Sequence, residues 1–128
     1  MPGKPLNTNS KRVLCVCRGG NSRSVGLAYI LKYCWGHDAL ACGVEGNDPN
    51  TIRMLCEWAD HIICMRPEFK EKIPLKYHGK IEVLDVGSDR YFQPHPDLLD
   101  QAMKFVQAHP VLRHIKKNID NARKRQKG

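Results

Sequence analysis

Four short apolar runs alternate with amphipathic stretches along the chain, and this alternation restricts the fold more than any other feature. The runs have the length and flanks of buried strands, and they cover residues 12–17, 38–43, 61–65 and 80–86. Strands that alternate with helices form a parallel sheet covered on both faces. The sequence therefore predicts an α/β fold: a three-layer sandwich with a four-stranded parallel sheet and helices on both faces.

Apolar residues recur at helical spacing in the segments between and after the runs. The first helix is expected over residues 22–35, where Gly36 stops it, with an apolar stripe at Val25, Leu27, Ala28, Leu31 and Cys34. A second helix is expected to begin at Asp48 and Pro49, as N-cap and first-turn proline. A short helix can start at Pro67. Later helices are expected around residues 98–106 and 111–122, separated by Pro110.

The length of 128 residues fits one domain with a real core. Residues 1–10 are expected to be a flexible lead-in, without the apolar segment of a secretory signal. No apolar run approaches the ~20 residues that span a bilayer. We therefore expect a cytoplasmic protein, and a monomer, whose six cysteines remain thiols. The stretch "CVC" has no second cysteine or histidine pair at a usable spacing, so no structural zinc site is expected. No organic cofactor is expected either.

The formal net charge of +8 is concentrated near the C-terminus. Residues 111–128 carry seven lysines and arginines against the single acid Asp120. A solvated, basic end of a helix accounts for this pattern. A patch for nucleic acid or an acidic partner is the alternative, but the segment lacks interleaved aromatic residues and a recognition motif.

The loop after the first run has the features of an anion site. Cys17 ends the run and Arg23 follows six residues later, with Gly19 and Gly20 between them. Backbone amides of a strand–loop–helix turn, together with the helix N-terminus, bind anions, and an arginine fork suits two oxygens of a tetrahedral oxyanion. The same positive field favours a nucleophilic thiolate at Cys17. Ser24 could donate a hydrogen bond to that sulfur and ease its departure.

An alternative interpretation is a strand–turn–helix junction in which Asn21 or Ser22 caps the helix and Cys17 is merely buried. Capping and catalysis are compatible, so this alternative does not exclude the site.

The stretch "VCRGGNSRS" resembles the phosphate-binding loop of the low-molecular-weight protein tyrosine phosphatases and their arsenate-reductase relatives. The resemblance extends through "ACG" and "WADHIICM" to an acidic loop after the fourth run, about residues 11–107. We expect a single phosphatase-like domain over residues 11–128, with a basic C-terminal helix. The resemblance implies that Cys17 is the nucleophile and that Arg23 binds the phosphoryl group. The expected phosphate-binding residues are Arg18, Gly19, Gly20, Asn21, Ser22 and Ser24.

Two positions depart from the family pattern. Gly20 stands where the family usually has an asparagine that holds the loop, and Ser22 replaces a second loop cysteine. The loop therefore lacks a side-chain lock, and a disulfide with Cys17 cannot form within it.

A general acid is needed to protonate the leaving group, and one carboxylic acid can also serve as the base for hydrolysis. The resemblance places it in the loop after the fourth run, where Asp89 fits best because Tyr91 stands two residues after it, as the family's aromatic does. Tyr91 and Phe92 could form a wall of the pocket, or they could instead anchor the loop to the core. Asp85 is the rival candidate, whereas Asp97 is expected to belong to the start of the next helix.

The sequence thus predicts a cysteine-dependent phosphatase that hydrolyses phosphotyrosine-like phosphomonoesters through a phosphocysteine intermediate. Its expected partner is a phosphorylated protein or a small phosphomonoester, with nucleic acid and membrane not expected. The alternatives are a phosphatase of phosphoarginine or of a phosphorylated metabolite, or a non-catalytic phosphate-binding module with a basic tail. Arsenate reduction needs a resolving cysteine, but none follows Cys64, and those at positions 34, 42, 56 and 64 are expected in the core. That activity would require glutathione or another external thiol.

Overall fold

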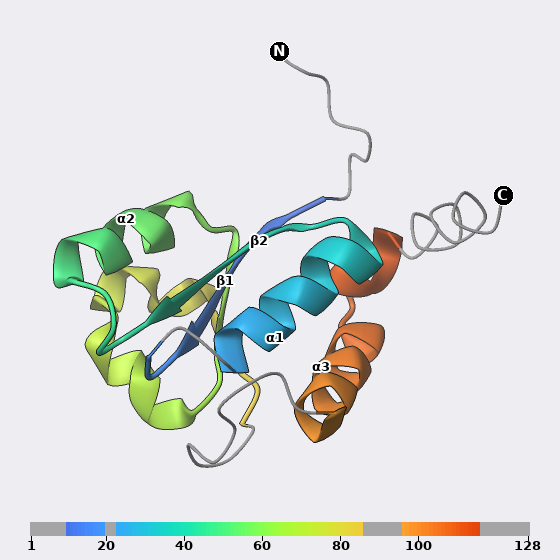
Figure 1. Cartoon of the computed structure of the whole chain (residues 1–128). Coiled ribbons are helices and arrows are strands. Elements are labelled where there is room, and N and C mark those ends of the chain that lie inside the picture. The colour runs from blue at the N-terminus through green and yellow to red at the C-terminus, as the bar shows by residue number, and fades with distance from the viewer. Residues whose placement is uncertain (1–9, 20–22, 86–95, 116–128) are drawn as a thin grey trace, which may run out of the picture.

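A four-stranded sheet with all strands parallel forms the centre of the protein (Figure 1). A computed structural model describes residues 10–19, 23–85 and 96–115. The strands lie in the order β2-β1-β3-β4, with bounds β1 Arg12–Cys17, β2 Asp38–Gly43, β3 His61–Cys64 and β4 Ile81–Val83. The predicted α/β fold is confirmed. The third and fourth strands are shorter than the predicted 61–65 and 80–86.

Helices cover both faces of the sheet, as predicted. On one face lie α1 (Arg23–Tyr29), its continuation η1 (Ile30–Cys34) and α3 (Pro96–Ala108), whereas α2 (Pro49–Trp58) lies on the other (Figure 1). Two short 3-10 helices, η2 (Pro67–Lys72) and η3 (Leu75–Lys80), follow β3. The sequence indicated a short helix from Pro67 but did not predict η3.

The central strands β1 and β3 hold the core and set the position of the candidate site. Every residue of β1 except Arg12 is buried, because helices cover this strand on both faces. Val16 pairs with Cys42 on one side and with Cys64 on the other. The order of the strands reverses at β1 and β3, and ligands of such sheets bind beyond the strand ends at this switch point.

The first helix differs from the predicted continuous helix over residues 22–35. It is α-helical only to Tyr29, and the next five residues form a π-helix, η1. Val25, predicted to be in the core, is 39% exposed, while Arg23 and Ser24 are buried. The buried face of α1 therefore differs from the face that the apolar stripe predicted. The helix packs against α3 as well as the sheet, and the stripe alone does not include that contact. Gly36 follows with a φ of 76°, a conformation that favours glycine.

The start of α2 follows the predicted cap. The carboxylate of Asp48 accepts a hydrogen bond from the backbone N–H of Thr51 at 2.9 Å, and Pro49 occupies the first helical position. This arrangement satisfies an N–H group that the helix leaves unpaired.

Two buried histidines hold the C-terminal segment: His37, directly before β2, and His109, within the segment itself. The Nε2 atom of His37 hydrogen-bonds the carbonyl oxygen of Leu112 at 2.7 Å, and His109 Nδ1 accepts from the N–H groups of Val111 and Leu112. Leu112 begins the 3-10 helix η4 (Leu112–Ile115), in place of the predicted start of an α-helix. The basic residues from 116 onward and most of the predicted lead-in, residues 1–9, lie outside the described residues. Within the described ranges no helix has both the length and the apolar character needed to cross a membrane.

Candidate active site

Cys17 and Ser24 meet at the carboxyl end of the central strand β1. The Cys17 sulfur lies 3.1 Å from the Ser24 hydroxyl oxygen, and both residues are buried. Cys17 ends the strand and Ser24 lies in the first turn of α1, so the loop between them returns the chain to the sulfur. A hydroxyl at this distance can donate a hydrogen bond to a thiolate and so stabilise its negative charge.

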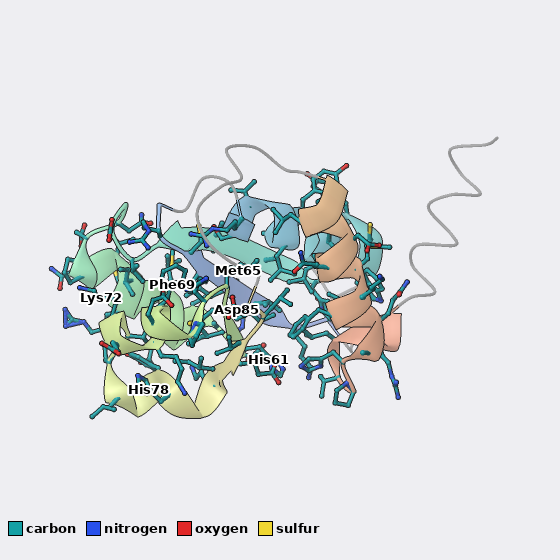
Figure 2. The ribbon with its side chains drawn as sticks, turned by 90° about the horizontal axis from the view of Figure 1, so that it is seen from below. His61, Met65, Phe69, Lys72, His78 and Asp85 are labelled. Atoms are coloured by element: carbon teal, nitrogen blue, oxygen red, sulfur yellow. The ribbon has the colours of Figure 1, made fainter. Side chains whose placement is uncertain are left out.

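Arg23 is the first residue of α1 and is 1% exposed. Its guanidinium carbon lies 5.5 Å from the centre of the Phe69 ring, within the range of a cation–π contact. Phe69 comes from η2 and lies nearer the centre of the molecule than Lys72 of the same helix (Figure 2). Burial and the contact with Phe69 restrict the Arg23 side chain to few conformations. A residue that orients an oxyanion needs such a restricted side chain.

Sequence reasoning did not assign Phe69 to the site. An apolar residue two positions after Pro67 was a recognisable sign of a buried contact. Nothing local indicated that Arg23, 46 positions earlier in the chain, would be its neighbour, because that contact depends on how η2 packs after β3.

The segment after β2 contacts the start of the loop. The N–H of Val44 donates to the carbonyl of Cys17 at 2.9 Å, and the N–H of Glu45 donates to that of Arg18 at 2.8 Å. The Arg18 guanidinium also forms an ion pair with the Glu45 carboxylate, at 3.1 Å. Sequence reasoning used "ACG" only as part of a family resemblance and did not predict these contacts.

Several predicted site residues cannot be placed. Gly20, Asn21 and Ser22 of the loop, and Asp89 and Tyr91 of the acidic segment, lie outside the described residues. Asp89 therefore stays a prediction as general acid. Among the predicted site residues, the structure brings together Cys17, Arg18, Gly19, Arg23 and Ser24, which lie at the end of β1 and the start of α1.

Asp85, the rival acid, lies just beyond β4. One of its carboxylate oxygens is 3.8 Å from a guanidinium nitrogen of Arg66, which also forms an ion pair with Glu68 at 3.2 Å. Asp85 follows Leu84, whose N–H donates to the carbonyl of Cys64 at the end of β3, at 2.9 Å; both Asp85 and Met65 are labelled in Figure 2. These contacts give Asp85 a structural partner at the end of the sheet. Asp97 lies in the first turn of α3, as its assignment to that helix predicted.

Four other cysteines are buried, and they lie in the sheet and α2. Burial raises the pKa of Cys42 and of Cys64 to about 12, and that of Cys56 to about 11; the pKa of Cys15 is also raised well above its usual value. Thiols with such pKa values remain protonated at neutral pH and react slowly. They are therefore poor candidates for the resolving cysteines that arsenate reduction needs.

One group of side chains away from Cys17 has the composition of a metal site. His61, Glu82 and His109 bring a ligand atom each within 4.8 Å of one another. However, His109 Nδ1 accepts hydrogen bonds from two backbone N–H groups, both at 3.1 Å. The ring proton must then lie on Nε2, which donates to Glu82 at 2.7 Å. This tautomer gives the ring no lone pair for a metal, so the residues present do not fit one.

Comparison with known proteins gives a structural relative. No family model and no curated protein matches the sequence. The fold is similar to that of Wzb from Vibrio vulnificus, solved in complex with benzylphosphonate, with a TM-score of 0.54 and 16% identity. The similarity covers 91% of this chain and 99% of that one. Wzb is a low-molecular-weight tyrosine phosphatase, so the fold predicted from the resemblance is confirmed.

Proposed function

We propose that the chain is a phosphatase of the low-molecular-weight protein tyrosine phosphatase family and that Cys17 is its nucleophile. The observation that carries this proposal is the placement of the Cys17 sulfur. It lies at the switch point of a parallel sheet, 3.1 Å from the Ser24 hydroxyl and six positions before the buried Arg23, the first residue of α1. A bound tetrahedral dianion at this point would meet the helix N-terminus and the guanidinium together.

The proposed reaction has two steps. The Cys17 thiolate attacks phosphorus, a sulfur–phosphorus bond forms, and the bond from phosphorus to the ester oxygen breaks. That oxygen takes a proton from Asp89, the predicted acid. Asp89 then accepts a proton from water, whose oxygen attacks phosphorus and breaks the sulfur–phosphorus bond. Ser24 stabilises the departing thiolate, and Arg23 stabilises the charge on the equatorial oxygens in both steps.

A phosphotyrosine-like substrate is the proposed class. Benzylphosphonate, the ligand in the Wzb structure, joins a phosphonate to an aromatic ring through a methylene group. It therefore has the shape of an aryl phosphate whose ester oxygen is replaced by carbon. Two further features extend this proposal to the present chain: the loop "CRGGNSRS" and the aromatic pair Tyr91 and Phe92 in the predicted acidic segment.

Hydrolysis of para-nitrophenyl phosphate without added metal tests the proposal. The wild type should turn over and be inhibited by orthovanadate, whereas Cys17→Ser should be inactive and still bind phosphate. Phosphotyrosine peptide and phosphoarginine, compared at equal concentration, distinguish the two substrate classes. A folded wild type that binds phosphate but hydrolyses none of the three compounds would contradict the proposal and favour a phosphate-binding module.

A further inference from the structure

We propose that the turn over residues 43–47 holds the phosphate-binding loop in place from outside and that Gly46 is its essential positioning residue. The inference rests on the proposed function, because it concerns the same anion site. It addresses a specific gap in that site: Gly20 stands where the resembled family has an asparagine to hold the loop. A loop that binds an anion through its amides needs some other source of rigidity.

Backbone hydrogen bonds provide the first contact. The N–H groups of Val44 and Glu45 donate to the carbonyl oxygens of Cys17 and Arg18, at 2.9 and 2.8 Å. They continue the pairing of β1 with β2 beyond the end of β2 at Gly43. The two carbonyls are thereby directed toward the turn, which fixes the orientation of the peptide groups at the entrance to the loop.

The second contact is a close approach of two glycines. A β carbon built on Gly46 would overlap the carbonyl oxygen of Gly19 and lie 3.1 Å from its carbonyl carbon. Among the described residues only Gly36 has a positive φ, so backbone conformation is not what requires glycine at position 46. The requirement is space: Gly46 lets the turn pack directly against the backbone of the loop.

The turn itself is firmly held and cannot easily retreat from the loop. Asn47 closes it twice, because its side-chain oxygen accepts from the N–H of Gly43 at 2.9 Å and its own N–H donates to the Gly43 carbonyl at 3.0 Å. Asp48 follows immediately as the N-cap of α2. A methyl group at position 46 should therefore displace Gly19 rather than the turn.

The ion pair between Arg18 and Glu45 is the third contact. Its two side chains are 45% and 58% exposed, so its contribution is modest. The pair directs Arg18 toward the turn. In this proposal Arg18 holds the start of the loop against the turn through Glu45, instead of binding substrate directly at the mouth of the pocket.

The Gly46→Ala variant tests the inference, with Gly79→Ala as the matched control. A β carbon at Gly79 would meet nothing within 4 Å, so the control makes the same chemical change without a contact. A displacement of about 1 Å can lower a reaction rate by ~100-fold. We expect Gly46→Ala to lose about that factor in kcat for para-nitrophenyl phosphate and to bind inorganic phosphate more weakly. Gly79→Ala should match the wild type in both measurements.

A folded Gly46→Ala protein with wild-type phosphate affinity and kcat would overturn the inference. Phosphate binding is measured by calorimetry and needs no turnover, so the inference can be judged even if the proposed phosphatase activity is absent. Loss of turnover in Gly46→Ala while Cys17→Ser keeps full activity would instead refute the proposed function.

The ion pair provides a second test if Gly46→Ala fails to fold. Glu45→Ala and Arg18→Ala should each weaken phosphate binding by up to about fivefold, and the double variant should be no weaker than either single one. If Glu45→Ala bound phosphate more tightly than the wild type, Arg18 would be a direct ligand of phosphate, and its proposed role in positioning the loop would be wrong.

Discussion

Replacing Phe69 by leucine should weaken phosphate binding through Arg23. The guanidinium carbon of Arg23 lies 5.5 Å from the Phe69 ring centre, and the two residues are 1% and 2% exposed. A cation–π contact shielded from water contributes about 2 kcal/mol. Because 1.4 kcal/mol corresponds to a tenfold change in affinity, the whole contact sets an upper limit of ~30-fold on the weakening of phosphate binding, reached if the contact is needed only to orient Arg23 for the bound state. Leucine keeps the site apolar but cannot provide the aromatic face that holds the guanidinium.

The same substitution also affects stability, so it needs a control of equal size. Phe69→Leu should cost on the order of 1–2 kcal/mol of unfolding free energy, from lost contacts and a small cavity. Phe105→Leu, on α3, trims a partly buried ring that contacts His109 instead of Arg23. Phosphate affinity is measured by calorimetry and stability by denaturant unfolding. If Phe69→Leu and Phe105→Leu lost similar stability and both kept wild-type phosphate affinity, Phe69 would be a core residue only.

Three further predictions concern single side chains. Ser24→Ala should lower kcat by ~10–100-fold, since hydrogen bonds to charged groups contribute about 1.5–3 kcal/mol, and stopped-flow measurement should show a burst because release from Cys17 is slowed. Cys42→Ala should leave kcat within about twofold in a steady-state assay, because burial raises the Cys42 pKa to about 12 and keeps that thiol inert. Asp48→Ala should lower the melting temperature at pH 7. Hydrogen bonds from Thr51 lower the pKa of Asp48, so the stabilising effect of its carboxylate is present above the usual carboxyl pKa. The effect is lost as pH falls through the lowered pKa, and the melting temperatures of the wild type and Asp48→Ala should therefore converge in acid.

The elements that the sequence predicted well are those set by local pattern. The run that became β1 is apolar at nearly every position because both faces of that strand are covered, and Asp48 with Pro49 marks a helix start by local chemistry alone. The position of Cys17 at a strand end followed from the same pattern. In each case both the sequence pattern and the structure that it predicts involve residues that are neighbours in the chain.

The features that sequence reasoning missed depend on contacts between distant segments. Val25 is exposed on a helix that packs against both the sheet and α3, and the apolar stripe does not encode that packing. The stacking of Phe69 on Arg23 and the approach of Gly46 to Gly19 join residues far apart in the chain. The neighbouring residues in the sequence do not distinguish a glycine that allows two backbone segments to pack closely from a glycine that is needed for a turn.

Trapping a phosphorylated Cys17 tests whether this residue is the nucleophile. The wild type and Cys17→Ser are mixed with para-nitrophenyl phosphate, quenched in acid within milliseconds and analysed by mass spectrometry of their peptides. We predict one added phosphoryl group on the wild-type peptide that contains Cys17, at higher occupancy in Ser24→Ala and absent in Cys17→Ser. Steady turnover with no phosphorylated cysteine in either the wild type or Ser24→Ala, or with the phosphoryl group on another residue, would contradict this prediction.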